Sequence, residues 1–361
     1  MSVLKRSFRL GVWFSAVVFL VASIACNNNG GSGSGSGSVS LQGAGATFPN
    51  PLYQKWLSEY GKLHPNMKID YQSIGSGGGI KQLKEQTVDF GASDSPMSDA
   101  DLKSAPGEIV HVPTVLGAVV VTYNLADVKQ PLRFSSEVLA DIFLGKIKKW
   151  NDPKIAADNP GVTLPANDVT VVHRSDGSGT SAVLTDYLSK VSPEWKEKVG
   201  SGVSPSWPTG IGGKGNEGVT GQVKNTPNTV GYVELAYALK NNLPVAHVKN
   251  SSGNFIEPTI DSVTAAAAGA AGNMPEDLRI SITNAAGAQA YPISSYTYIL
   301  VYKNQKDAAK GKALVDFLWW GIHDGEGFAK ELQYAPLPAD IVKRAEAKIN
   351  SVTSNGTALR P

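Results

Sequence analysis

Two long runs of strand-forming residues, 117–123 and 296–302, limit the possible folds of this chain more than any other feature. The long segment 124–295 separates them, and strand-like and helix-like stretches alternate along the chain from Leu41 onward. This alternation is typical of the α/β class. We therefore predict two lobes, one built from both chain ends and one from the middle of the chain, joined by the two runs. Central strands of a single sheet are the alternative interpretation.

The first 25 residues have the pattern of an export signal. Lys5, Arg6 and Arg9 are followed by an apolar run, 10–25, that is short for a membrane span. Cys26 comes directly after this run and is the only cysteine of the chain, so no intramolecular disulfide can form.

Cys26 resembles the lipid-attachment cysteine of bacterial lipoproteins, although Ser23 stands where such proteins usually carry leucine. Residues 27–40 are rich in glycine, serine and asparagine and suit a flexible tether. Acyl chains on Cys26 would hold the protein at a membrane surface. Cleavage after Ala25, which would release a free exported protein, remains the alternative.

These features predict the boundaries of the chain's parts. They are a signal peptide at 1–25, an anchor cysteine with a Gly/Ser-rich tether at 26–40, a first lobe at 41–117 plus 296–361, and a second lobe at 118–295.

The charge of the chain gives no reason to expect a nucleic acid partner. The formal net charge is +2, and it falls to −1 without the signal peptide, which holds three basic residues and no acid. A nearly neutral protein has no general attraction for polyanions. Any anion site must therefore be built from local groups.

Three loops rich in glycine and hydroxyl groups each precede a predicted helix, at 43–49, 75–79 and 174–180. A glycine-rich turn at a helix start exposes backbone N–H groups, and the helix dipole favours negative charge there. Arg174 can add charge-assisted contacts to an oxyanion, and Asp94 ends a predicted strand. Each loop alone is more typical of a helix cap, but the set predicts an anion site.

The helix after the first loop is expected to begin at Pro51, with Asn50 as its cap. Apolar and aromatic side chains recur on one face of it, at Leu52, Tyr53, Trp56, Leu57 and Tyr60.

Patterns of nucleotide and hydrolase chemistry fail in this chain. No glycine loop has the lysine and hydroxyl spacing of a phosphate loop. Ser76 and Ser178 lack the glycine two positions earlier that a nucleophile elbow needs. The run 210–215 matches the dinucleotide spacing, but it lacks a clear strand and helix beside it, so we expect a loop. The histidines show no metal-ligand spacing, and His173 is expected at a lobe surface.

Seven segments form a recognisable set, at 43–49, 75–79, 88–94, 144–150, 176–181, 212–216 and 230–234. Together they closely resemble the bacterial phosphate-binding proteins of the high-affinity phosphate ABC transporter. The resemblance covers the chain from Leu41 to about Leu337. It implies an α/β, two-lobe periplasmic-binding-protein fold (type II-like), with the ligand cleft between the lobes and two hinge strands. It also implies a protein without enzymatic activity that binds inorganic phosphate outside the cytoplasmic membrane and delivers it to an ABC permease.

The resemblance also implies the ligand contacts. They fall on Thr47, Phe48, Ser76, Asp94, Arg174, Ser178, Gly179 and Thr180, and the acid that braces the arginine falls on Asp176. It implies no catalytic residue, no metal and no cofactor. The expected partners are phosphate, the permease subunits and, through Cys26, a membrane, and the protein is expected to be a monomer without a nucleic acid partner.

The residue types suit phosphate on chemical grounds. Phosphate near neutral pH still carries protons, whereas sulfate carries none. The ionised carboxylate of Asp94 can only accept a hydrogen bond, so it accepts one from protonated phosphate and repels sulfate. Arg174 supplies positive charge, and Asp176 holds it in place.

Two other functions could use the same cleft. They are a phosphatase-like enzyme and a phosphate-sensing or adhesin surface protein. An enzyme would need a nucleophile beside a base or a metal, and the sequence offers no suitable cluster.

Overall fold

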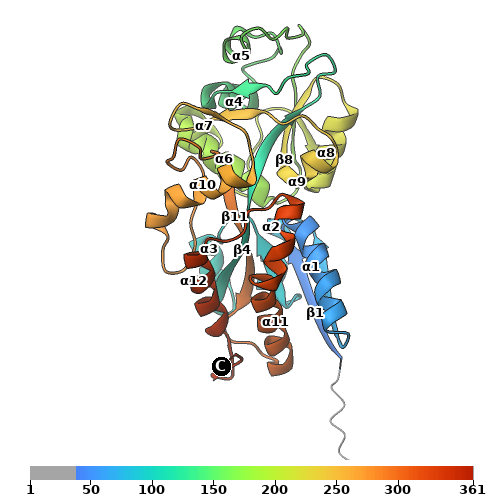
Figure 1. The fold of residues 1–361 in the computed structure, drawn as a ribbon, viewed down its shortest axis with the longest axis vertical. Coiled ribbons are helices and arrows are strands. Elements are labelled where there is room, and N and C mark those ends of the chain that lie inside the picture. The colour runs from blue at the N-terminus through green and yellow to red at the C-terminus, as the bar shows by residue number, and fades with distance from the viewer. Residues whose placement is uncertain (1–37, 361) are drawn as a thin grey trace, which may run out of the picture. The chain divides into compact units, whose positions relative to one another are not determined.

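The computed structural model describes residues 38–360. Eight strands of this part form one mixed sheet in the order β2-β1-β3-β11-β4-β8-β6-β7 (Figure 1). They are β1 (Val39–Gly45), β2 (Met67–Ser73), β3 (Phe90–Ser93), β4 (Ile109–Tyr123), β6 (Thr170–Arg174), β7 (Ile211–Gly213), β8 (Thr229–Glu234) and β11 (Ser294–Tyr302). The expected α/β class is confirmed.

Strand β4 connects the two halves of this sheet. It pairs antiparallel with β11 from Ile109 to Ala118, and then antiparallel with β8 from Val119 to Tyr123. All of its residues are buried. The two predicted strand runs are therefore neighbouring central strands of one sheet, as in the alternative interpretation. Because β4 also changes partner along its length, it carries the chain from one half to the other.

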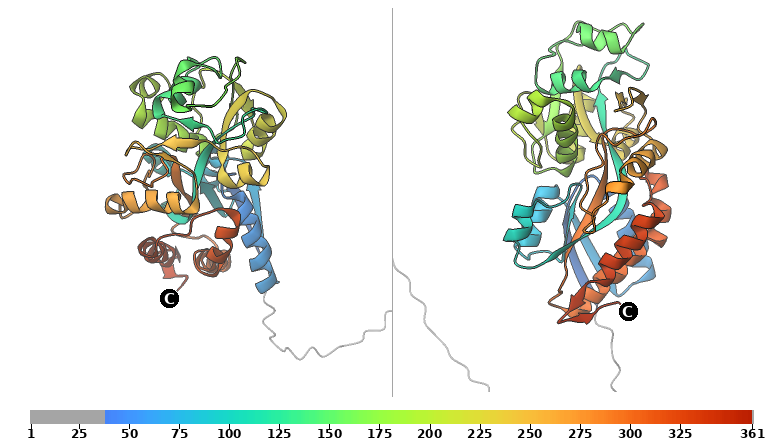
Figure 2. Two further views of the ribbon diagram at one scale, coloured as in Figure 1. Left: turned by 45° about the horizontal axis from the view of Figure 1, so that its top comes forward. Right: turned by 90° about the vertical axis from the view of Figure 1, so that its left-hand side faces the viewer.

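Each half has its own helices and forms one lobe of the expected two-lobe fold. Figure 2 shows the green and yellow middle of the chain gathered in one lobe and the blue and red ends in the other. The first lobe holds α1 (Asn50–Leu63), α2 (Ser76–Lys84), α3 (Asp99–Ser104), α11 (Ala308–Gly321) and α12 (Ala339–Asn350). The second holds α4 (Ser136–Phe143), α5 (Pro153–Asp158), α6 (Gly179–Val191), α7 (Pro193–Lys198), α8 (Gly215–Asn225) and α9 (Leu235–Lys240).

Smaller elements complete the described part. Helix α10 (Ile260–Ala270) packs on β4 and β11. A three-stranded sheet has the order β10-β9-β5, and β12 pairs with β13. Their bounds are Arg133–Phe134 for β5, His247–Lys249 for β9, Phe255–Ile256 for β10, Thr353–Ser354 for β12 and Thr357–Ala358 for β13. Three 3-10 helices lie at Ala271–Asn273, Asp324–Phe328 and Lys330–Leu332.

The core of the first lobe is aromatic. The predicted face of α1 is buried at Leu52, Tyr53, Trp56 and Tyr60 and half-buried at Leu57. The rings of Tyr53 and Trp56 stack with centroids 5.5 Å apart, and Trp56 meets Phe317 of α11 edge to face. Such pairs stabilise a core beyond the area that they bury. They hold α1, and the loop before it, firmly against the sheet.

Two local predictions are wrong. Helix α1 begins at Asn50 rather than Pro51, and Pro49 precedes it with no side-chain cap. The run 210–215 is not a loop, because β7 covers Ile211–Gly213 and α8 begins at Gly215. The strand is only three residues long, which explains why no strand pattern was visible in the sequence.

The predicted signal peptide and Cys26 lie outside the described residues. Strand β1 begins at Val39, two residues inside the predicted tether 26–40. Among residues 38–360, no helix is both long enough and apolar enough to cross a membrane.

Candidate ligand-binding site

The predicted site residues lie where strands end. Strand β1 pairs parallel with β2 and β3 in the first lobe, and β6 pairs parallel with β7 and β8 in the second. The carboxyl ends of parallel strands open into a common crevice, where α/β proteins bind their ligands. Every predicted contact lies at or shortly after one of these ends, and the structure brings all eight together with Asp176. Their side chains are buried at Thr47, Phe48, Ser76, Asp94, Arg174, Ser178 and Thr180.

Arg174 and Asp176 form a bidentate ion pair. Its Nε donates to Oδ1 of Asp176 at 2.8 Å, and its Nη2 donates to Oδ2 at 2.6 Å. The backbone N–H of Gly215 also donates to Oδ1, at 3.0 Å. Burial alone would raise the pKa of Asp176, but the hydrogen bonds and charge of Arg174 hold it below its usual value. The acid therefore stays ionised and braces the guanidinium, as the resemblance implied.

The remaining edge of the guanidinium faces the crevice. A guanidinium has five N–H donors, so Nη1 and one hydrogen of Nη2 are not needed for Asp176. Nη1 donates to Oγ1 of Thr180 at 3.3 Å. The aromatic side chain of Tyr232 fixes the strand behind Arg174, because its hydroxyl accepts from the Arg174 backbone N–H at 3.0 Å. This edge can serve an anion that enters the crevice.

Helix α6 begins inside the site. Ser178 is its N-cap and accepts a hydrogen bond from the backbone N–H of Ser181 at 3.0 Å. Gly179 and Thr180 are the first helical residues, and N–H groups of a first turn have no acceptor within the helix. With the helix dipole, they favour a negative group at this point.

The glycine loops meet backbone to backbone. The N–H of Gly77 donates to the carbonyl of Gly177 at 2.9 Å. A Cβ on Gly75 would lie 2.4 Å from Asp176 Oδ2, and one on Gly179 would lie 2.3 Å from Ser76 Oγ. Only glycine permits so close an approach of the two lobes.

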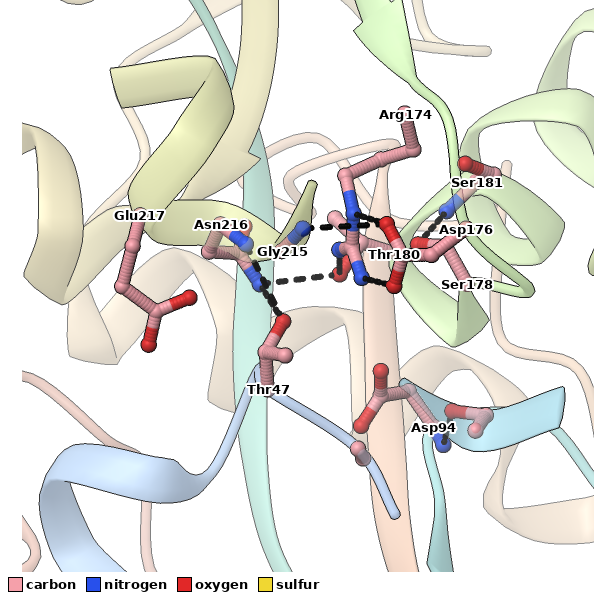
Figure 3. A network of polar contacts seen from close by, with 12 residues as sticks. Thr47, Asp94, Arg174, Asp176, Ser178, Thr180, Ser181, Gly215, Asn216 and Glu217 are labelled. Atoms are coloured by element: carbon pink, nitrogen blue, oxygen red, sulfur yellow. Dashed lines mark hydrogen bonds and ion pairs between the residues drawn. The ribbon is translucent and has the colours of Figure 1, made fainter. Parts of the chain in front are cut away.

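Asp94 differs from every other predicted contact, because its ionised side chain offers only acceptors. Its Oδ1 accepts from the hydroxyl of Thr297 at 3.0 Å, and its Oδ2 has no partner among the described residues. Burial raises the pKa of Asp94 to about 7, although the hydroxyl of Thr297 and the charge of Arg174 act against this. Leaving a buried carboxylate oxygen unpaired costs free energy, so a ligand that donates a hydrogen bond to this oxygen is stabilised here. Figure 3 shows this carboxylate below Arg174 and Thr180.

A cleft of about 400 Å³ is lined by Asp94 and by residues of both lobes. Ser95 and Ser295 lie beside Asp94 in its wall, and Ala182 and Val183 line it from α6. Among residues 38–360 no cluster of histidine, cysteine, aspartate and glutamate is suited to hold a metal ion.

The sequence interpretation missed two polar residues of the site, Asn216 and Thr297. Asn216 of α8 bonds to Thr47 of the first lobe and to Thr180 of the second (Figure 3). Its signal was the run 210–215, whose glycines precede a helix as in the other three loops. Thr297 lies in the run 296–302, which was interpreted only as a strand. His173, which was expected at a lobe surface, is half-buried, and its ring stacks on Trp207 with centroids 5.1 Å apart.

The fold and the crevice define a two-lobed binding protein, and the PBP superfamily domain matches residues 30–319. The phosphate-binding protein PstS of Xylella fastidiosa strain 9a5c is 47% identical over 308 residues, which cover 85% of this chain and 84% of that protein. That of Pasteurella multocida strain Pm70 is 47% identical over 322 residues, covering 88% and 93%. The chain belongs to this family of phosphate-binding proteins.

Solved structures share the fold at lower identity. A phosphate-binding protein from Stenotrophomonas maltophilia matches with a TM-score of 0.67 and 20% identity, covering 88% of this chain and 96% of that one.

Proposed function

We propose that this protein binds inorganic phosphate outside the cytoplasmic membrane and delivers it to an ABC permease for import, without catalysing a reaction. The proposal rests on the family and on one observation above all, the unpaired Oδ2 of the buried Asp94 beside a cluster of donors. Hydroxyls, backbone N–H groups and a guanidinium satisfy the oxygens of any tetrahedral oxyanion. The carboxylate of Asp94 adds an acceptor, and only an oxyanion that carries a proton can donate a hydrogen bond to it.

The proposed phosphate contacts come from both lobes. Thr47, Phe48, Ser76 and Asp94 belong to the first, and Arg174, Ser178, Gly179 and Thr180 to the second, with Asp176 behind the arginine. Phe48 would contribute its backbone N–H, because its ring is buried and its carbonyl accepts from the Tyr334 hydroxyl at 2.7 Å. Binding across two lobes favours their closed arrangement, since only that arrangement completes the donor set.

The lobe boundaries remain a proposal, at 41–117 plus 296–361 and at 118–295. They are supported by strand β4, whose pairing partner changes from β11 to β8 between Ala118 and Val119. A closed form with both lobes in contact is the state that a permease would recognise.

The export and anchoring of the chain are further proposals from the sequence. Residues 1–25 would be removed as a signal peptide, Cys26 would carry the lipid, and the Gly/Ser-rich segment up to residue 40 would separate the binding domain from the membrane. The binding domain would act as a monomer. Cys26→Ala tests the anchor, because it is expected to move the protein from the membrane fraction to the soluble one and to abolish fatty-acid labelling.

Titration calorimetry with phosphate and with sulfate tests the binding function. We expect tight binding of one phosphate per chain and far weaker binding of sulfate. Equal affinity for the two anions would contradict the role of Asp94. Incubation with a chromogenic phosphate ester separates binding from catalysis, and turnover of the ester would contradict a purely binding function.

A further inference from the structure

Asn216 connects three parts of the site through one side chain. It is fully buried near the start of α8. Its Oδ1 accepts a hydrogen bond from the backbone N–H of Glu234 at 2.9 Å. Because a backbone N–H can only donate, this bond determines which end of the amide is oxygen. Nδ2, which can only donate, therefore faces the hydroxyls of Thr47 and Thr180 (Figure 3).

Both hydroxyls receive two hydrogen bonds. Oγ1 of Thr47 accepts from Nδ2 of Asn216 at 2.7 Å and from the Asn216 backbone N–H at 3.2 Å. Oγ1 of Thr180 accepts from Nδ2 of Asn216 at 3.2 Å and from Nη1 of Arg174 at 3.3 Å. A threonine hydroxyl has two acceptor lone pairs and one hydrogen to donate. With both lone pairs engaged, each hydroxyl retains only its donor function.

We propose that Asn216 is a positioning residue that fixes the hydroxyls of Thr47 and Thr180 as hydrogen-bond donors toward the bound phosphate. The inference rests on the proposed function and assigns Asn216 a task within it. A hydroxyl that could rotate freely would present lone pairs to the anion in part of its orientations. Asn216 removes those orientations in both lobes at once, without touching the ligand.

This arrangement separates the polarity of the site into two parts. The hydroxyls of Thr47 and Thr180 and the guanidinium of Arg174 present hydrogens, while Asp94 is the proposed contact whose side chain presents an unpaired carboxylate oxygen. An anion that carries a proton matches this pattern at every position. The discrimination by Asp94 between protonated and unprotonated anions depends on these fixed hydroxyl orientations. A hydroxyl that turned its lone pairs toward the anion would supply a second acceptor and leave an oxygen of the anion without a donor.

A double-mutant cycle with Asn216→Ala and Thr180→Val tests the proposal. Asn216→Ala removes the hydrogen bonds to Thr47 in both backgrounds, so this contact between the lobes cancels from the coupling that the cycle measures. Each single change is expected to weaken phosphate binding about tenfold or more in calorimetry. The loss caused by Asn216→Ala should be at least about threefold smaller in the Thr180→Val background, because one of its two hydroxyls is then absent. Equal losses in both backgrounds would overturn the proposal and leave a merely structural role.

Asn216→Asp provides a second variant of the same shape. It keeps an oxygen for the Glu234 N–H and replaces the Nδ2 donor with an acceptor, so both hydroxyls can turn toward it. Phosphate affinity is expected to fall further than in Asn216→Ala, and undiminished affinity would overturn the proposal. The same substitution is then made in the Thr180→Val background. The added negative charge acts in both backgrounds, whereas the turning of the Thr180 hydroxyl is possible only where Thr180 is present.

Asn250→Ala is the matched control. Asn250 is also buried, and its Nδ2 donates to the backbone carbonyls of Gly287, Ala288 and Ala290. Its loss should lower the melting temperature and leave phosphate affinity unchanged. An equal loss of affinity in this variant would attribute the Asn216 effect to general destabilisation. Absence of phosphate binding by the unaltered protein would contradict the proposed function itself, whereas normal binding with a purely additive cycle would contradict only the role of Asn216.

Discussion

Gly179 of the second lobe lies directly against Asp94 of the first. A Cβ placed on Gly179 would lie 2.5 Å from Asp94 Oδ2 and 2.8 Å from Asp94 Cβ. The carboxylate is therefore enclosed by the first turn of α6 whenever the lobes meet. Burial raises the pKa of this carboxyl, and its Oδ2 has no hydrogen-bond partner among the described residues.

Gly179→Ala should therefore prevent full closure. We expect phosphate affinity to fall about tenfold or more, because displacing well-packed atoms costs roughly 1–3 kcal/mol. Gly221→Ala is the control, since Gly221 lies within α8 and a Cβ there would meet nothing within 4 Å. Calorimetry on both variants checks this, and equal affinities would show that the lobes need not approach so closely.

Asp94→Asn should reduce the preference for phosphate over sulfate. The carboxylate can only accept, whereas the amide can donate to a sulfate oxygen, so the penalty against sulfate is removed. The ratio of the two affinities should fall by about tenfold or more, as the loss of one buried charged partner implies. Competition calorimetry at about pH 8, above the pKa of about 7 at which Asp94 ionises, measures the ratio, and a ratio equal to that of the unaltered protein would mean that Asp94 does not discriminate.

The raised pKa of Asp94 also predicts a pH dependence of stability without phosphate. Between about pH 4 and about pH 7 the unfolded chain releases this proton while the folded protein keeps it. The folded state then binds more protons, so the contribution of Asp94 to the free energy of unfolding falls as pH rises through this range. Above about pH 7 both states are ionised and the contribution is constant.

Thermal unfolding of the ligand-free protein and of Asp94→Asn measures this contribution. The melting temperature of the variant, relative to the unaltered protein, should rise steadily from about pH 4 to about pH 7. A difference that does not change with pH would show that the carboxyl keeps its ordinary pKa in the folded state.

Much of this candidate site could be predicted because glycine-rich segments at helix starts indicated an anion site and carried most of the resemblance that implied the individual contacts. Arg174, Asp176, Ser178 and Thr180 lie within seven consecutive positions, and a local pattern of that kind can be recognised without knowledge of the fold. Asn216 and Thr297 follow from the topology, which places β7 beside β6 and β11 beside β3. Strand β7 has only three residues, which is too short a pattern to predict its pairing with β6. The antiparallel pairing of β11 with β3 could not be predicted either, because the two strands lie far apart in the sequence.

Thr297 offers a test that depends on this pairing. Its hydroxyl donates to Asp94 Oδ1 and lowers the pKa of that carboxyl, so Thr297→Val should raise the pKa of Asp94 further. Phosphate binding is then expected to weaken at neutral pH, because more of the carboxyl is protonated and no longer accepts, and to recover in part as pH rises. Thr122→Val is the matched control, since Thr122 is equally buried in β4 and its hydroxyl donates only to the Pro244 carbonyl at 2.8 Å. Calorimetry across a pH series compares the two variants. If both follow the pH profile of the unaltered protein, the hydroxyl of Thr297 does not act through Asp94.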